Sequence, residues 1–187
     1  MIFYPKKEFV QINLSDYTLI LPSVSVGNVG QLAVDLLIST LPSVKIGIVH
    51  HAALYPLVGS DPYNADSTEV VTSADLHVVR EHSMVLMQIR SPLIKKERQT
   101  FLKEMLSWCK DVAIKNIIIL ASCNAFERWE HSQIMGSQLR YLTTLAEDRE
   151  ALRSLGAVEL EEREDEYGQK HRFLSGAGYV EHLMKMR

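Results

Sequence analysis

The chain has 187 residues, of which 47% are hydrophobic and 23% are charged. This length is enough to bury the core of one compact domain, so we expect a single domain over residues 1–187. The 20 Lys and Arg and 23 Asp and Glu residues give a net charge of −3 without a cluster of basic side chains, which argues against nucleic acid as the main partner.

The first predicted element is a buried strand over Tyr17 to Val26, because apolar and β-branched side chains occupy both of its faces. A Gly-Asn-Val-Gly loop follows at residues 27–30, and Gln31 to Thr40 has the apolar spacing of a helix that ends before Pro42. Lys45 to Val49 is a second apolar run. Its position after a short helical crossover predicts a parallel strand.

The middle of the chain combines loop residues with short apolar runs. After a loop marked by Pro56, Gly59 and Pro62, three β-rich runs predict strands: Thr68 to Val71, Leu76 to Val79 and Met84 to Ile89. The best-defined helix follows Pro92, because an apolar stripe is formed there by Phe101, Leu102, Met105, Leu106 and Cys109. The continuous β-branched run from Asn116 to Ala121 then predicts a buried strand.

The C-terminal part is predicted to form a helix over Glu147 to Leu155, followed by an acidic segment. Six acidic side chains fall within residues 159–166, so we expect this segment to be solvated and mobile. It lacks the ligand spacing of a calcium-binding loop. The alternation of strands and helices predicts an α/β fold, as a single three-layer domain with a mostly parallel central sheet flanked by helices and some antiparallel additions.

The loop from Gly27 to Gly30 is the sharpest local motif, because α/β proteins bind phosphates with the amides of a helix that follows a strand. Its G-x-x-G spacing lacks the three glycines of a dinucleotide fingerprint and the Gly-Lys-Ser/Thr of a P-loop. We interpret it as a structural turn with close backbone packing. A phosphate or nucleotide site is the alternative, and no cofactor-binding residue is assigned.

The seven histidines raise the question of a metal site. His50 and His51 form the most suggestive pair, but adjacent strand residues point to opposite faces and no carboxylate is near them in the sequence. We expect His77 and His82 to flank a turn, and His131 to lie in an exposed polar loop. No metal ligand is assigned.

Three residues are candidate nucleophiles. Ser25 lacks the G-x-S-x-G elbow, and Cys109 belongs to the apolar stripe of a helix, so core packing is its expected role. Cys123 follows a strand at its carboxyl end, a usual position for functional residues in α/β sheets. No His or Asp partner is apparent for it, so no catalytic residue is assigned.

The two cysteines are too few and too far apart in the sequence for a disulfide scaffold or a zinc site, which predicts a reduced intracellular compartment. Met1 to Val10 contains Pro5, Lys6 and Lys7, so a signal peptide is not expected. The longest apolar runs are much shorter than the roughly 20 residues that cross a bilayer. We expect a cytoplasmic location, with the nucleus as a second compartment that the sequence leaves open.

The segment from Leu19 to Leu41 closely resembles the N-terminal signature of the proteasome assembly chaperone 2 family. The likeness covers essentially residues 17–145 and weakens through the acidic tail. It continues through Lys45-Ile46-Gly47, Pro56-Leu57-Val58-Gly59, Pro62-Tyr63, Gln88-Ile89-Arg90-Ser91, Leu106-Ser107-Trp108, Ile118-Ile119-Leu120 and Leu139-Arg140-Tyr141-Leu142.

The resemblance implies a chaperone for assembly of the proteasome core particle, which acts as a heterodimer with proteasome assembly chaperone 1. Such a heterodimer binds the forming α-ring, prevents off-pathway association of α-subunits and leaves as the particle matures. The implied partners are therefore proteasome assembly chaperone 1 and proteasome α-subunits, without nucleic acid or membrane. No catalysis and no cofactor are implied, and the physical expectation is an exposed apolar sheet edge or helix face.

The C-terminus departs from the family pattern. Family members run longer, and their C-terminal end is expected to insert into pockets on the α-ring, whereas this sequence ends Leu-Met-Lys-Met-Arg without a penultimate tyrosine. We therefore expect a chain that lacks the C-terminal region of longer members. Two alternatives stay open: a truncated form that binds its partner chaperone but not the ring, and a small-ligand α/β enzyme that uses the Gly27 to Gly30 loop.

Overall fold

The computed structural model describes residues 1–124, 137–164, 167–168, 170–172, 174–184 and 186. The chain divides into two compact units, and each is described by itself. The first unit combines Met1–Cys123 with Gly176–Arg187, and the second is Asn124–Ser175. The expectation of a single domain over residues 1–187 stays a prediction. No helix in the described part of the chain is long and apolar enough to cross a membrane.

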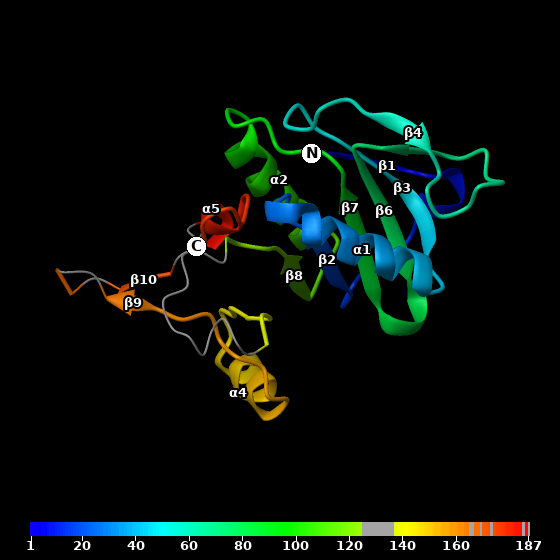
Figure 1. Ribbon diagram of the computed structural model, residues 1–187. Coiled ribbons are helices and arrows are strands. Elements are labelled where there is room, and N and C mark those ends of the chain that lie inside the picture. The colour runs from blue at the N-terminus through cyan, green and yellow to red at the C-terminus, as the bar shows by residue number, and fades with distance from the viewer. Residues whose placement is uncertain (125–136, 165–166, 169, 173, 185, 187) are drawn as a thin grey trace. The chain divides into compact units, whose positions relative to one another are not determined.

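A six-stranded sheet with the order β1-β3-β6-β7-β2-β8 forms the centre of the first unit (Figure 1). Its strands are β1 (Ile2–Pro5), β2 (Thr18–Pro22), β3 (Val44–His50), β6 (Ala74–Val79), β7 (Met84–Ile89) and β8 (Asn116–Leu120). The helices of this unit are α1 (Val29–Thr40), α2 (Arg98–Asp111) and α5 (Val180–Met184). A small hairpin of β4 (Val58–Ser60) and β5 (Val70–Thr72) lies between β3 and β6 in the chain.

Successive side chains of the strands point to opposite faces of the sheet and form two separate clusters. Leu19, Leu21 and Met87 pack with the buried residues of α2, whereas Ile20 and Leu86 pack with the buried residues of α1. The two long helices therefore cover opposite faces. This arrangement confirms the predicted α/β fold with helices on both sides of the sheet.

The sheet is more antiparallel than the sequence suggested. β2 pairs with β7 and β8 in parallel, but the pairs β1–β3, β3–β6 and β6–β7 are antiparallel. β6 and β7 are joined by a short turn over residues 80–83, which allows only antiparallel pairing. β3 runs in the direction of β2, as the crossover predicted, but both of its neighbours run the other way.

The second unit contains α4 (Ala146–Ser154) and a two-stranded hairpin of β9 (Arg163–Glu164) and β10 (Lys170–His171). Several acidic side chains of residues 159–164 form ion pairs. Glu159 lies 3.2 Å from Arg149 and 3.4 Å from Arg153, Glu161 lies 2.9 Å from Arg140, and Glu162 lies 2.7 Å from Arg172. Asp165 and Glu166 are outside the described residues, so the mobility of residues 159–166 stays a prediction.

Candidate protein-interaction surface

The carboxyl ends of parallel strands are the usual ligand site of an α/β sheet. At the carboxyl end of β2, a returning C-terminal segment makes three hydrogen bonds. Ser23 Oγ donates to the carbonyl of Ala177 at 2.7 Å, the backbone amide of Tyr179 donates to Ser23 Oγ at 2.9 Å, and the Tyr179 hydroxyl donates to the carbonyl of Pro22 at 2.7 Å. The chain itself therefore fills the space beyond β2.

The Gly27 to Gly30 loop also packs tightly against backbone. Gly27 has a φ of +66°, which favours glycine, and a Cβ atom on Gly30 would lie 2.2 Å from the carbonyl oxygen of Leu120. Gly30 thus lets α1 approach β8 closely. This geometry agrees with the interpretation of the loop as a structural turn.

The three candidate nucleophiles, Ser25, Cys109 and Cys123, lie in structural surroundings. Ser25 Oγ lies 3.0 Å from Ser122 Oγ and accepts a hydrogen bond of 3.0 Å from the Ser122 amide, an interaction that joins two loops. Cys109 is buried in α2, as predicted, and burial raises the pKa of its thiol to about 12, which keeps it protonated. Cys123 is half-buried and unpaired with another cysteine.

The histidines are dispersed. His50 is exposed and His51 is buried, which agrees with the prediction that they point to opposite faces. His51 Nδ1 accepts a hydrogen bond of 2.8 Å from the amide of Ala53, and burial lowers the pKa of His51.

His77 and His82 do not both flank a turn, as the sequence suggested. His82 lies in the turn after β6, but His77 lies within β6 and is buried. His131 is outside the described residues. Within the described ranges, no group of three His, Cys, Asp or Glu could hold a metal ion.

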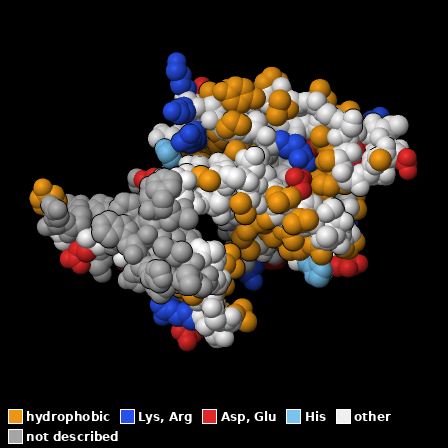
Figure 2. Space-filling view, viewed as in Figure 1, with side chains coloured by type: hydrophobic (Ala, Val, Ile, Leu, Met, Phe, Trp, Pro, Cys, Tyr) orange, Lys and Arg blue, Asp and Glu red, His pale blue; other side chains and the backbone are white. Residues whose placement is uncertain are grey.

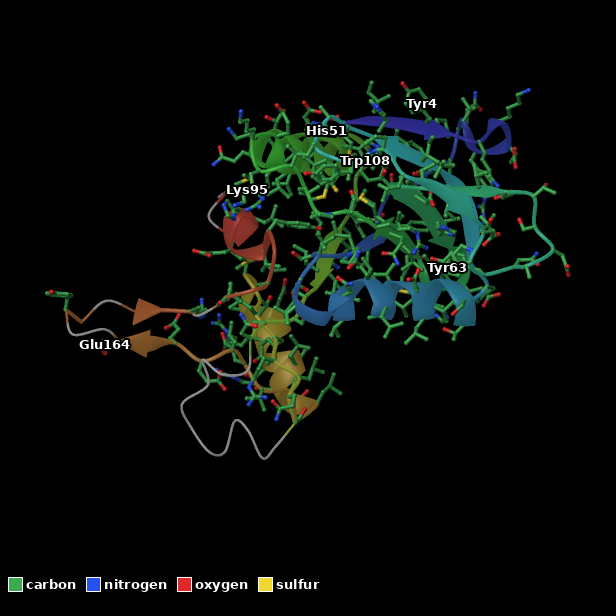
Figure 3. All side chains as sticks on the ribbon, turned by 45° about the horizontal axis from the view of Figure 1, so that its top comes forward. Tyr4, His51, Tyr63, Lys95, Trp108 and Glu164 are labelled. Carbon is green, nitrogen blue, oxygen red and sulfur yellow. The ribbon has the colours of Figure 1, made fainter. Side chains whose placement is uncertain are left out.

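A cluster of polar side chains fixes the loop after β4 to α1. The Tyr63 hydroxyl donates a hydrogen bond to the Asp35 carboxylate on α1, and Arg90 Nη2 lies 3.0 Å from Asp35 Oδ1 and 2.7 Å from the Tyr63 hydroxyl. Figure 3 shows Tyr63 beside α1. The Tyr63 ring also contacts the His77 ring edge-on, at 5.9 Å between centroids. We call Asp35, Tyr63, His77 and Arg90 the Tyr63 cluster.

Burial and hydrogen bonds shift the pKa values of Asp35 and Tyr63 in opposite directions. Burial would raise the pKa of Asp35, but hydrogen bonds from Tyr63, Gln88 and Arg90 and the charge of Arg90 outweigh it and lower that pKa. Burial and the bond to Asp35 raise the pKa of Tyr63, so its hydroxyl remains a donor. The cluster orients α1 and shows no arrangement of nucleophile and base.

The outer face of α1 is apolar and exposed. Val34 and Ile38 point into the core, whereas Val29, Leu32 and Leu36, at three- and four-residue spacing on the other side, are 53%, 60% and 54% exposed. Figure 2 shows hydrophobic side chains gathered over α1. Ile118 of β8 is 46% exposed and, because it is in register with Ile20, lies on the same face of the sheet as α1.

We call Val29, Leu32, Leu36 and Ile118 the α1 surface. It adjoins the outer edge of β8, a strand that has β2 as its only partner among the described residues. An apolar helix face next to an edge strand without charged side chains is typical of a protein-binding region. The sequence contained a signal for it, because Leu32 and Leu36 place apolar side chains outside the stripe that α1 needs for its core.

The chain matches a known protein family over most of its length. The model of the PAC2 family matches residues 19–186. The chain is 39% identical over 176 residues to "Proteasome assembly chaperone 2" of Xenopus tropicalis, which covers 89% of this chain and 67% of that relative. It is 36% identical over 155 residues to the protein of the same name from Homo sapiens, covering 81% of this chain and 58% of that relative.

The fold has solved counterparts as well. The crystal structure of Pyrococcus furiosus PbaA, described as an archaeal homolog of proteasome-assembly chaperone, superimposes with a TM-score of 0.60 at 17% identity and covers 81% of this chain and 62% of that one. At this identity the likeness concerns the fold alone. The chain spans between about three-fifths and two-thirds of the length of the curated relatives described above, at 58% and 67%.

Proposed function

Because this chain belongs to the PAC2 family, we propose that it is a chaperone for assembly of the proteasome core particle. The observation that carries the proposal is the identity of 39% over 176 residues to a relative named for this activity. The match to the family model, over residues 19–186, includes both long helices of the first unit and every strand of its central sheet except β1. The activity therefore resides in surfaces that bind other proteins, and we propose no catalysis and no cofactor.

The partner in this proposal is proteasome assembly chaperone 1, which forms a heterodimer with this chain and engages proteasome α-subunits with it. The heterodimer promotes α-ring formation and prevents off-pathway association of α-subunits. Its place of action is the cytoplasm, with a nuclear pool. The chain covers only part of its relatives, and formation of the heterodimer and contact with the ring are two separately testable interactions.

The α1 surface is our candidate for contact with the partner chaperone. Its side chains are apolar and lie on a rigid helix, and removing them from water favours association by about 25 cal/mol per Å² of apolar area. The Tyr63 cluster fixes the orientation of this helix through Asp35, so the surface is preformed. A preformed apolar surface binds with less loss of conformational entropy.

The experiment is co-expression with proteasome assembly chaperone 1, followed by size-exclusion chromatography with and without a mixture of free α-subunits. We expect a one-to-one complex that retains α-subunits. A one-to-one complex that ignores α-subunits would support the truncated-form alternative. The absence of any complex would contradict the heterodimer and favour the small-ligand alternative. The C-terminal segment that packs at the carboxyl end of β2 argues against that alternative.

A further inference from the structure

An open groove of about 630 Å³ lies between α2 and α5. These helices belong to the same compact unit and lie side by side in Figures 1 and 3. The groove is on the side of the sheet that α2 covers, opposite the α1 surface. Its lining residues are Gln99, Lys103, Leu106, Ser107, Lys110, His182 and Met186.

The groove is basic although the chain as a whole has a net charge of −3. Lys103 and Lys110 are exposed, and neither has an ion-pair partner among the described residues. No Asp or Glu belongs to the lining. Two unpaired ammonium groups on an otherwise neutral groove attract carboxylates, and the attraction is screened by salt.

The charges have a regular geometry because they stand on one helix. Phe101, Leu102 and Met105 of α2 point into the core, which turns Lys103 and Lys110 outward. The two lysines are seven residues apart, so their Cα atoms are separated by about 10 Å along the helix axis. Leu106 lies between them on the same side, and Met186 supplies a second apolar side chain to the groove.

We propose that this groove binds an acidic amphipathic helix of a partner protein. Two Asp or Glu side chains seven residues apart on such a helix have the same spacing as Lys103 and Lys110. A large apolar side chain between them would pack on Leu106 and Met186. Because Leu106 lies between the two lysines, the groove can contact both the acidic side chains and the apolar face of a docked helix. This binding goes beyond the proposed function, because it uses the opposite side of the sheet from the α1 surface.

The test uses a fluorophore-labelled synthetic helical peptide with two Glu residues seven positions apart and a Leu between them. Fluorescence anisotropy at low salt measures its binding to the full chain. The Lys103→Gln/Lys110→Gln variant removes both groove charges, and Lys7→Gln/Lys115→Gln removes two exposed charges outside the groove as a matched control. A second peptide with Gln in place of both Glu residues controls for apolar binding.

We expect the Glu peptide to bind and the groove variant to weaken it about two- to five-fold for each lysine removed. The control variant should bind like the original chain, and the Gln peptide should bind as weakly as the Glu peptide binds the groove variant. The groove variant should still form the heterodimer, so that failure of this proposal is distinct from failure of the proposed function.

Three outcomes would overturn the proposal. The first is no binding of the Glu peptide at low salt, and the second is equal binding to the original chain and the groove variant. The third is binding to phosphatidylserine vesicles that the groove variant abolishes while peptide binding is unchanged. That last result would assign the two lysines to an anionic lipid surface.

Discussion

The hydroxyl of Tyr179 donates a hydrogen bond of 2.7 Å to the backbone carbonyl of Pro22, 157 residues earlier in the chain. Tyr179 is only 3% exposed, and burial raises its pKa, so the hydroxyl stays protonated and remains a donor. Because Pro22 ends β2, this bond anchors the C-terminal segment at the carboxyl end of the sheet. The place where an α/β enzyme would hold its ligand serves here to close the fold.

The Tyr179→Phe substitution should therefore destabilise the protein without creating a cavity. It leaves the buried carbonyl of Pro22 without this donor, which typically costs about 1–3 kcal/mol. Urea denaturation monitored by circular dichroism measures the free energy of unfolding. Tyr4→Phe is the matched control, because Tyr4 is exposed, and it should change that free energy by less than about 0.5 kcal/mol. Equal effects of the two substitutions would contradict the anchoring role.

Gly30→Ala should be strongly destabilising. The added Cβ would lie 2.2 Å from the carbonyl oxygen of Leu120, and backbone cannot move aside as a flexible side chain can. Overpacking of this kind costs roughly 1–3 kcal/mol or more. At Gly59, which also has an ordinary φ, an added Cβ would lie 3.7 Å from a Val71 methyl group, so Gly59→Ala should be tolerated. Thermal unfolding of both variants decides the point, and a stable Gly30→Ala protein would refute the close approach of α1 to β8.

Tyr63→Phe should loosen the β4–β5 hairpin. The substitution removes the hydroxyl that bonds to both Asp35 and Arg90, at a cost of about 1–3 kcal/mol because both partners are charged. Amide hydrogen exchange over residues 58–72 should become faster, whereas exchange in β2 and β7 should change less. Tyr55→Phe, at an exposed tyrosine near the same hairpin, provides the control. Unchanged exchange in Tyr63→Phe would mean that the hairpin is held by other contacts.

His77 should make stability depend on pH. It is 5% exposed, and Nε2 has no hydrogen-bond partner in the described part of the chain. Burial lowers its pKa from 6.5 to about 4, with further effects from charges that face it: Asp75, Lys45, Asp61 and Arg90. Between pH 6.5 and pH 4 the unfolded chain therefore binds the extra proton, so stability decreases as pH falls through this window.

The loss attributable to His77 amounts to at most about 3.5 kcal/mol, because its pKa falls from 6.5 to about 4 and each pKa unit corresponds to about 1.4 kcal/mol. Urea denaturation at pH 7.5 and pH 4.5 measures it. His77→Gln should reduce the difference between the two pH values, whereas His82→Gln, at an exposed histidine, should leave it unchanged. An identical pH dependence in His77→Gln and the original chain would show that His77 is not the group responsible.

Leu32→Asp/Leu36→Asp should abolish the proposed heterodimer without unfolding the chain. Both leucines are more than half exposed, so the substitutions should alter the free energy of unfolding little while placing charge in an apolar interface. Size-exclusion chromatography of the co-expressed chains should show free monomers. Val10→Asp, at another exposed apolar residue, is the control and should retain the complex. A complex that tolerates both α1 changes would place the interface elsewhere.

The sequence predicted the elements whose patterns are local. The stripe around Phe101 and Met105 is the core face of α2, and the β-branched run at Asn116 to Leu120 is a strand. The prediction that this strand is buried was wrong, because it lies at the edge of the sheet and Ile118 is 46% exposed. The fold class followed from the alternation of such segments, and the family resemblance came from the residues around the glycine loop. The antiparallel pairing of β3 with β1 and β6 could not be predicted from the sequence, because it depends on contacts between distant residues.

The sequence by itself thus determined where both long helices and most strands of the central sheet lie, because the period of apolar residues records burial within each segment. The short elements β1, β4 and α5 were not predicted. Only the tertiary structure decided which apolar residues remain exposed. Leu32 and Val34 are both apolar, but Val34 points into the core and Leu32 lies on the outer face of α1. Likewise, only folding brings Tyr179 to Pro22 and places Lys103 and Lys110 beside α5. A site built from distant segments exists only after the whole chain has packed.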